Sequence, residues 1–423
     1  MNYALCIADN VKEFVKKHLK DDVNRLALAK FPDGIDREFV IRQIHARQVL
    51  SKKLPSWAEN DELVFPKKLS LEQCSSELTA KYKSSLVKGK TLIDLTGGMG
   101  VDTTFLSDNF DKTYYVEMQE ELCEIAKHNF KLLNKNIEVV NDNAEHFLTI
   151  CDDVDCIYLD PARRDEYGRK MVSLHDCTPD VVELHDILLK KAKRILIKVS
   201  PMLDIEMVKK ELKDISEIHV VAVRNECKEI LLEIQEFRSS GVQGFEDSET
   251  QRLCNSATSI DVIATDLREG WNFVFTEDEE HESQWTLADA VGKYLYEPGV
   301  ACMKAGCFKL LSQRYALDKL HRNSHLYTSD TLVADFPGRV FEVLNVVPFD
   351  KKTKKAIWTT NISESRSLGD SVTLKKANVA VRNFPLSAEE LKKNLGLQDG
   401  SDFYIFGTTM KGEKKTVILT KKV

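Results

Sequence analysis

The segment with the clearest chemical meaning is residues 94–100, Asp-Leu-Thr-Gly-Gly-Met-Gly, which follows the short apolar run Thr91-Leu92-Ile93. A carboxylate followed at once by glycines lets the backbone come close to a ligand where any Cβ would clash. Residues 101–107 are expected to form a helix whose N-terminal amides face the same place. Taken alone, the pattern is also typical of a tight strand-to-helix turn, so the neighbouring segments decide its meaning.

Three further apolar runs end in polar side chains: residues 113–116 at Glu117, residues 137–140 shortly before Asp142, and residues 156–159 at Asp160-Pro161. Because the carboxyl ends of parallel strands meet at one edge of a sheet, we expect these groups to lie together where open α/β sheets bind ligands. Glu117 can accept two hydrogen bonds from ribose hydroxyls, and Asp142 is placed to accept from an adenine amino group. Each acid alone is more often a helix cap or a solvated turn, but together the segments favour a nucleoside-binding edge.

These four segments resemble the motifs of the class I S-adenosylmethionine-dependent methyltransferases. The first motif departs from the family at Thr96, where glycine is usual, which predicts a slightly wider backbone approach there. A dinucleotide-dependent oxidoreductase is the alternative, but that class has a G-x-G-x-x-G turn and rarely an Asp-Pro turn after its fourth strand. The resemblance implies S-adenosylmethionine as the cofactor.

The resemblance also implies which residues bind the cofactor: Asp94, Thr96, Gly97, Gly98, Gly100, Glu117, Met118, Asp142, Asn143 and Ala144. In related enzymes the segment upstream of the first strand folds over the methionine end of the cofactor. That adds Ser75 and Ser76, with Gln73 beside them. The alternative role for the two serines is to cap the helix that follows.

The predicted catalytic residues are Asp160 and Pro161. In amino-methylating relatives, this Asp side chain and the proline carbonyl accept hydrogen bonds from an exocyclic NH2 group, while an aromatic ring two places after the proline stacks on the base. Here that place holds Arg163, so stacking on the substrate is assigned to Arg163 itself or to Tyr167. Methylation at a pyrimidine C5 atom would need a nucleophilic cysteine, and the corresponding segment, residues 198–201, has none. Methylation of an amino group on a base is therefore favoured.

The apolar periodicity predicts the elements that hold these residues. We expect an α/β fold with a Rossmann-like class I methyltransferase sheet, mostly parallel with a C-terminal antiparallel hairpin at residues 219–223 and 230–234. A helical segment precedes the sheet and a smaller α+β domain follows it. Four domains are predicted. They are an N-terminal helical region (residues 1–85), a methyltransferase domain (86–238), a connecting loop and hairpin (239–295) and a THUMP-like domain (296–423).

The C-terminal domain resembles the module called THUMP-like that accompanies one bacterial group of these enzymes. The matching segments are residues 294–298 (YLYEP), 336–339 (FPGR) and 382–385 (RNFP). Helical patterns are expected over 302–320, and the order strand, helix, strand, strand over 378–419. True THUMP modules present structured RNA to a methyltransferase, so the resemblance implies RNA as the partner.

Charge is unevenly distributed along the chain, whose net charge is −7. Residues 351–423 hold 15 Lys and Arg against 7 Asp and Glu, a net of +8, which leaves −15 for residues 1–350. The basic residues form two clusters: Lys351, Lys352, Lys354 and Lys355, and Lys411, Lys414, Lys415, Lys421 and Lys422. Such clusters are typical either of a face that contacts phosphates or of an ordinary solvated surface.

Other properties indicate a cytoplasmic enzyme. No run of about eighteen apolar residues is present, so no membrane span is expected, and the N-terminus lacks the pattern of a secretory signal. The 10 cysteines are scattered without a C-x-x-C pair, which favours reduced thiols and no metal site. An RNA methyltransferase is the leading hypothesis. The alternatives are a small-molecule or protein methyltransferase, and a catalytically silent protein that binds the cofactor or RNA.

Overall fold

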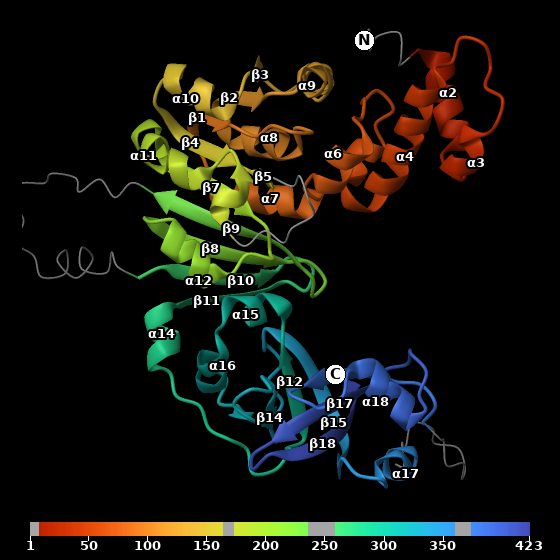
Figure 1. Ribbon diagram of the computed structural model, residues 1–423, viewed down its shortest axis with the longest axis vertical. Helices are drawn as coiled ribbons and strands as arrows, with labels where there is room; N and C mark the ends of the chain where they lie inside the picture. Colours follow the sequence, from red (N-terminus) through yellow and green to blue (C-terminus); the bar gives the residue numbers. More distant parts are fainter. Residues whose placement is uncertain (1–7, 164–172, 236–258, 360–373) are drawn as a thin grey trace, which may run out of the picture. The chain divides into compact units, whose positions relative to one another are not determined.

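The computed structural model describes residues 8–163, 173–235, 259–359 and 374–423 (Figure 1). The chain divides into two compact units, residues 1–218 with 229–246 and residues 219–228 with 247–423. The finer division predicted at residues 85, 238 and 295 stays a prediction. No helix in the described ranges is long and apolar enough to cross a membrane.

The first unit begins with the predicted helices, drawn red to orange in Figure 1: α2 (Asp9–His18), α3 (Val23–Ala27), α4 (Arg37–Lys53), α5 (Pro55–Ala58), α6 (Lys68–Gln73) and α7 (Glu77–Leu86). Val11 and Val15 lie one turn apart on α2, and both are buried against Phe39 and Ile44 of α4. That spacing is the apolar stripe expected of a helix packed on a neighbour.

Seven strands of one sheet are β1 (Gly89–Asp94), β2 (Phe110–Glu117), β3 (Ile137–Asn141), β4 (Val154–Leu159), β7 (Ala192–Val199), β8 (Ile215–Ala222) and β9 (Cys227–Gln235). Within that sheet they stand in the order β8-β9-β7-β4-β1-β2-β3. The strands from β7 to β3 are parallel, and β9 is antiparallel to β7. This is the mostly parallel sheet with a C-terminal antiparallel hairpin that the sequence predicts.

Helices follow the parallel strands: α8 (Val101–Leu106), α9 (Glu120–Leu132), α10 (Ala144–Ile150), α11 (Val181–Lys191) and, after β7, α12 (Ile205–Glu211). The central strands are buried on both faces; Leu92 and Ile93 of β1, and Ile157 of β4, have no exposed surface. Continuous apolar runs such as these are typical of a parallel sheet covered by helices. The alternation of strand and helix brings the carboxyl ends of β1, β2, β3 and β4 to one edge.

The second unit has a β10–β11 hairpin (Asp261–Asp266 and Trp271–Thr276) followed by α14 (Glu277–Glu282). Its other elements are β12 (Tyr294–Pro298), α15 (Val300–Ala305), α16 (Phe308–Arg314), β13 (Asp318–Lys319), β14 (Tyr327–Ser329), β15 (Gly338–Pro348), α17 (Thr353–Trp358), β16 (Asn378–Arg382), α18 (Ala388–Leu395), β17 (Phe403–Met410) and β18 (Lys414–Lys422). The strands β12 to β18 form a sheet of order β13-β14-β12-β15-β18-β17-β16.

The predicted order strand, helix, strand, strand is confirmed as β16, α18, β17 and β18. The helical patterns predicted over 302–320 correspond to two helices, α15 and α16, and the chain then enters the short β13. Gly306 ends α15 in the left-handed region at a φ of 84°, a conformation that glycine adopts without a Cβ penalty. The three segments matched to the THUMP-like module meet in space, because Arg339 and Arg382 both pair with the buried carboxylate of Glu297.

Candidate functional site

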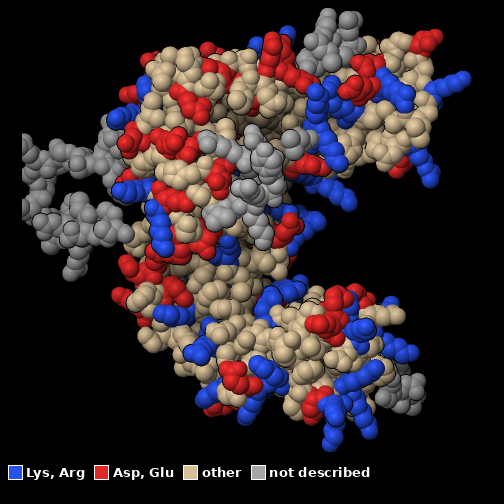
Figure 2. Space-filling model, in the orientation of Figure 1, with Lys and Arg blue, Asp and Glu red and all other residues tan. Residues whose placement is uncertain are grey.

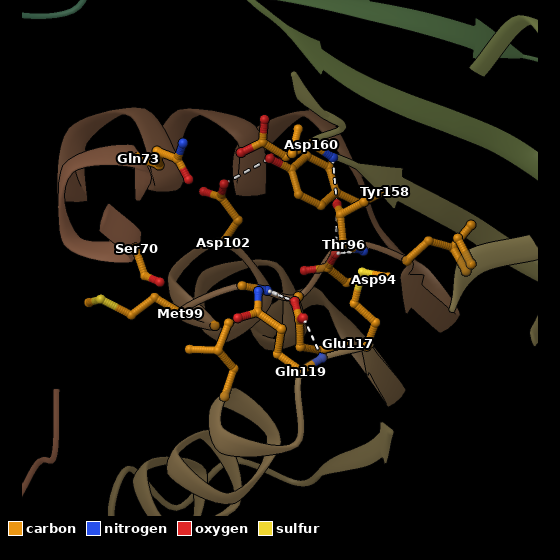
Figure 3. Close-up of a pocket in the computed structure, with 18 of the residues that line it drawn as sticks. Ser70, Gln73, Asp94, Thr96, Met99, Asp102, Glu117, Gln119, Tyr158 and Asp160 are labelled. Carbon is orange, nitrogen blue, oxygen red and sulfur yellow. Dashed lines mark hydrogen bonds between the residues drawn. The ribbon is translucent and has the colours of Figure 1, made fainter. Parts of the chain in front are cut away.

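The carboxyl ends of the parallel strands surround a cavity of about 210 Å³ in the first unit (Figure 3). Its lining includes eleven of the twelve predicted cofactor-binding residues: Ser75, Asp94, Thr96, Gly97, Gly98, Gly100, Glu117, Met118, Asp142, Asn143 and Ala144. The predicted catalytic Asp160 lines it as well. The structure therefore brings together residues spread over 86 positions of the chain, which fits the expectation of one functional edge.

The glycines after β1 have different physical roles. A Cβ on Gly97 would lie 2.2 Å from the ring of Tyr115, and one on Gly100 would lie 2.8 Å from the ring of Phe130. Both glycines therefore allow the loop to pack on the protein's own aromatic side chains. Gly98 has a φ of 54°, and a Cβ there would meet only the Thr96 carbonyl oxygen, at 3.8 Å. Of the three, Gly98 is the glycine that leaves room for a ligand.

Glu117, at the end of β2, is held in place by two backbone N–H groups. Its Oε2 atom accepts from Gly98 at 2.9 Å and its Oε1 atom accepts from Gln119 at 2.8 Å. A carboxylate oxygen has two acceptor positions, so each oxygen can still accept one hydroxyl hydrogen. The orientation suits the two neighbouring hydroxyls of a ribose.

Asp94, at the end of β1, is almost fully buried. Its Oδ1 atom accepts from the backbone N–H of Thr96 at 3.0 Å, and its Oδ2 atom accepts from the hydroxyl of Thr103 at 2.5 Å. Burial raises the pKa of the Asp94 carboxyl to about 7, although both hydrogen bonds act in the opposite direction. The group at the base of the cavity therefore changes charge close to neutral pH.

Asp142 and Asn143 follow β3 and begin α10. The Asn143 side chain caps the helix by accepting from the backbone N–H of His146 at 2.8 Å. Asp142 accepts from the Asn143 N–H at 2.9 Å and lies 2.6 Å from the Nδ1 atom of His146. The hydrogen bond with His146 lowers the pKa of Asp142. His146 was not among the predicted residues, and its position four residues after Asp142 on a helix is the signal that could have indicated it.

The two predicted serines in the segment before β1 have different contacts. Ser75 lines the cavity, and its hydroxyl donates to Asp102 at 2.7 Å. Ser76 is the N-cap of α7 and forms a capping box with Thr79. The cavity lining does not include Ser76, whereas Gln73, at the end of α6, belongs to it.

A network of buried charges lies beside the cavity. Lys83 of α7 has no exposed side-chain surface and donates to both oxygens of Glu229 on β9, at 2.7 and 2.9 Å. The Lys83 ammonium also lies 3.3 Å from Asp102. Asp102 in turn accepts from the hydroxyl of Tyr158 at 2.7 Å, a bond drawn in Figure 3. Burial alone would raise the pKa of Asp102, but the ammonium groups of Lys83 and Lys198 outweigh it and lower that pKa.

Asp160, at the end of β4, is tied to two neighbours. Its backbone N–H donates to the hydroxyl of Thr96 at 2.6 Å, and its Oδ2 atom lies 2.5 Å from the Nζ atom of Lys198 on β7. The first contact explains the departure at Thr96, because a glycine has no hydroxyl to link the loop after β1 to the end of β4. Burial alone would lower the pKa of Lys198, but Asp160, Asp102 and Glu229 outweigh it and hold that pKa above its ordinary value.

The remaining predicted site residues follow Asp160. Pro161 is not among the residues that line the cavity, although Ala162 is. The backbone of Arg163 belongs to β5 (Ala162–Arg163), which pairs with β6 (Cys177–Thr178), and Thr178 of β6 lines the cavity. The side chain of Arg163 and the whole of Tyr167 lie outside the described residues. Their predicted contact with the substrate stays a prediction.

Two protein-family models match the C-terminal part of the chain. A family model described as a ferredoxin-like domain matches residues 294–337, and one described as THUMP domain-like matches residues 338–422. No curated protein matches the chain.

Several solved structures are similar. A "putative methyltransferase" from Porphyromonas gingivalis W83 is 32% identical with a TM-score of 0.82, over 100% of this chain and 99% of that chain. An rRNA methylase from Streptococcus thermophilus is 15% identical with a TM-score of 0.29, over 38% of this chain and 94% of that one. Because the similarity to the P. gingivalis protein extends over both whole chains, this protein belongs to the same family, the class I methyltransferases with a C-terminal THUMP-like domain.

Proposed function

We propose that the protein is an S-adenosylmethionine-dependent methyltransferase that acts on RNA. The observation that carries the proposal is the cavity at the carboxyl ends of the parallel strands, with Glu117, Asp142 and Asp94 around it. S-adenosylmethionine supplies a methyl group on a positively charged sulfur, which a nucleophile can displace in line. The protein's contribution to such a reaction is largely to bring the two reactants together in the right orientation.

The cavity residues fit this cofactor. The open space at Gly98 admits a ligand next to the backbone, and the two oxygens of Glu117 keep acceptor positions for the ribose hydroxyls. Asp142 keeps a carboxylate near the place predicted for the adenine ring, although His146 already occupies one side of it. Asp94 and Ser75 also line the cavity and would hold the methionine end.

RNA as the acceptor is supported by the THUMP-like description of residues 338–422 and by one lysine cluster. Lys351, Lys352, Lys354 and Lys355 are all exposed around the start of α17, and Figure 2 shows Lys and Arg side chains gathered in this region of the second unit. The other cluster is partly neutralised, because Lys411 pairs with Asp289 at 2.7 Å and Lys415 lies 3.7 Å from Glu413. The lysines at α17 are therefore the better candidates for contacts with phosphates.

The sequence favours an amino group of a base as the acceptor, on the strength of Asp160 and Pro161. Cysteines in the described ranges are all free thiols, which supports the cytoplasm as the proposed site of action.

Two measurements test the proposal. Isothermal titration with S-adenosylhomocysteine is expected to show one site per chain. Incubation with methyl-labelled S-adenosylmethionine and total RNA from cells that lack the gene is expected to label the RNA, whereas RNA from cells that keep the gene, already modified, takes up less label. Absence of S-adenosylhomocysteine binding would contradict the cofactor assignment. Binding without labelling of RNA would favour a small-molecule or protein acceptor.

A further inference from the structure

We propose that the acceptor atom is a hydroxyl oxygen, in RNA the ribose 2′-hydroxyl, and that the Asp160–Lys198 pair prepares it for methylation. This inference rests on the proposed function and replaces the base amino group predicted from the sequence. Asp160 lines the cavity and is the residue that contacts the acceptor. Lys198 pairs with Asp160, and its positive charge also acts on the acceptor oxygen as negative charge develops there.

The pair is built into two adjacent strands. β4 and β7 run parallel with Leu159 opposite Ile197, so the residues that follow them in register come together at the carboxyl edge. The Nζ atom of Lys198 lies 2.5 Å from the Oδ2 atom of Asp160. The Asp160 side chain is 34% exposed and lines the cavity, whereas the Lys198 side chain is 13% exposed and does not belong to the lining. The carboxylate therefore faces a substrate while the ammonium supports it from behind.

Charge distinguishes the two kinds of acceptor. When a neutral amino nitrogen takes a methyl group it becomes positively charged until a proton leaves, and an unpaired carboxylate stabilises that charge. In this site the carboxylate is already neutralised by an ammonium group at hydrogen-bond distance, which removes most of that benefit. A hydroxyl oxygen instead gains negative charge as it loses its proton, and a fixed ammonium group nearby stabilises it.

Buried charges keep Lys198 in its ammonium form. The acidic groups that act on it are Asp160, Asp102 and Glu229, and together they outweigh the effect of burial. Lys83 is the other cation of the network, and it is held by Glu229 and Asp102. An ammonium group kept charged in this way is suited to stabilise an oxyanion and not to serve as a base, so the proton has to leave through Asp160.

The part of the cavity that the structure describes presents no aromatic face to a base, and Tyr167, which the sequence predicts to stack on one, lies outside that part. Enzymes that modify a base take it out of the helical stack and hold it against aromatic or apolar side chains. Among the described residues that line the cavity, Tyr158 is the one aromatic side chain. Tyr158 is 1% exposed, and its hydroxyl is bound to Asp102, so its ring offers no face to a base. A ribose hydroxyl needs no such platform.

The chemical step balances with these groups. The hydroxyl oxygen forms a bond to the methyl carbon while the carbon–sulfur bond breaks, and the electron pair of that bond stays on the sulfur. The hydroxyl proton passes to the Asp160 carboxylate and from there to water. Lys198 stays protonated throughout and lowers the energy of the oxygen as its negative charge develops.

The test determines where the label enters RNA and whether Lys198 is needed. RNA from cells that lack the gene is incubated with the full-length protein and methyl-labelled S-adenosylmethionine, digested to nucleosides, and the glycosidic bond is then cleaved. We expect the label to stay with the sugar. Lys198→Met is expected to lower labelling by about 100-fold or more, and Lys198→Arg, which keeps the charge, to lower it less. Affinity for S-adenosylhomocysteine is expected to stay unchanged in both.

The same two strands provide a matched control. Lys193 of β7 pairs with Asp155 of β4, also at 2.5 Å, but at the opposite end of the strands from the cavity. The Lys193→Met variant is expected to label RNA to the same extent as the wild-type protein. If Lys198→Met does not fold, Asp160→Asn removes the proton acceptor with little change in shape and is expected to give the same loss.

Three outcomes would contradict different parts of this inference. Label that leaves with the base overturns the hydroxyl assignment and keeps the proposed function. Wild-type labelling by Lys198→Met overturns the role of the pair. No labelling of RNA by a protein that binds S-adenosylhomocysteine contradicts the proposed RNA substrate, and this inference with it.

Discussion

Glu117 accepts a hydrogen bond from the backbone N–H of Gly98 at 2.9 Å, which joins the end of β2 to the loop that follows β1. The hydrogen bond holds the two strand ends together and fixes the orientation of the carboxylate. Fixing a group in advance reduces the entropy lost on binding. We therefore expect Glu117 to contribute both to the shape of the site and to the affinity for the proposed cofactor.

The first prediction concerns this carboxylate. Replacing Glu117 with alanine removes the proposed acceptor for both ribose hydroxyls. Because charge-assisted hydrogen bonds contribute on this scale, we expect a loss of about 2–3 kcal/mol in the affinity for S-adenosylhomocysteine, measured by calorimetry. Glu124→Ala on α9, an exposed glutamate paired with Lys127, is the control and is expected to bind like the wild type. Unchanged binding by Glu117→Ala would remove Glu117 from the site.

A second prediction follows from the burial of Asp94. Its pKa is about 7 in the folded protein and about 3.9 in an unfolded chain. Between these values the folded state holds a proton that the unfolded state has lost, so the free energy of unfolding falls as the pH rises. The stabilisation that comes from the protonated Asp94 carboxyl is complete below about pH 4 and is lost as the pH rises through 7.

Asp94→Asn isolates this effect, because the amide has the shape of the carboxyl and does not titrate. We expect the stability of the wild type, relative to Asp94→Asn, to decrease by up to about 4 kcal/mol between pH 4 and pH 8, measured by urea denaturation at each pH. A difference that does not change over this range would show that Asp94 is ionised throughout.

The sequence predicts those site residues that belong to a local pattern along the chain. Asp94, Glu117 and Asp160 each follow an apolar run, so their place at the carboxyl edge follows from strand periodicity alone. Ser76 was ambiguous, because a serine before a helix is typical both of a cap and of a lid, and the structure places it at the N-cap of α7.

The buried charges could not be predicted in the same way. Lys83 and Glu229 are 146 residues apart, and neither follows a motif. A lysine on a helix is usually solvated, and the sequence alone does not indicate that α7 lies against β9 with this face inward. The helical patterns predicted over 302–320 form two short helices, because the left-handed turn at Gly306 ends α15 before α16 begins at Phe308.

The third prediction tests that network. Lys83→Met leaves the carboxylates of Glu229 and Asp102 buried without their cation, and breaking a buried pair in this way costs about 3–5 kcal/mol of stability. Lys81→Met on the same helix removes an exposed pair with Glu77 and is expected to cost at most about 0.5 kcal/mol. Urea denaturation of the two variants gives the comparison. If both variants are equally stable, Lys83 is not held in the buried network.

A companion variant separates the lost pair from the lost packing. In Lys83→Met with Glu229→Leu, both partners become apolar, and replacing a whole ion pair in this way is often neutral or stabilising. We expect the double variant to be more stable than Lys83→Met alone. A double variant that is less stable would show that Glu229 has another partner whose loss dominates.

The last prediction concerns the exposed lysines at the start of α17. If they contact phosphates, each one releases counterions when RNA binds, and the affinity falls steeply as salt rises. Reversing all four to glutamate is expected to weaken RNA binding and to flatten its dependence on salt, measured by filter binding over a range of salt concentrations. The effect is expected to be similar for different RNA sequences, because phosphate contacts position the substrate and do not read bases.

The control reverses four exposed lysines of the N-terminal helices and their connections, Lys17, Lys20, Lys30 and Lys52, which changes the net charge of the protein equally. If net charge alone governs binding, both variants lose affinity alike. If the surface at α17 is the contact, the control keeps most of its salt dependence and the α17 variant does not. Affinity for S-adenosylhomocysteine stays unchanged in either case, because neither set of lysines lines the cavity. Equal losses in the two variants would therefore remove the lysines at α17 as the RNA-binding surface while leaving the cofactor site as described.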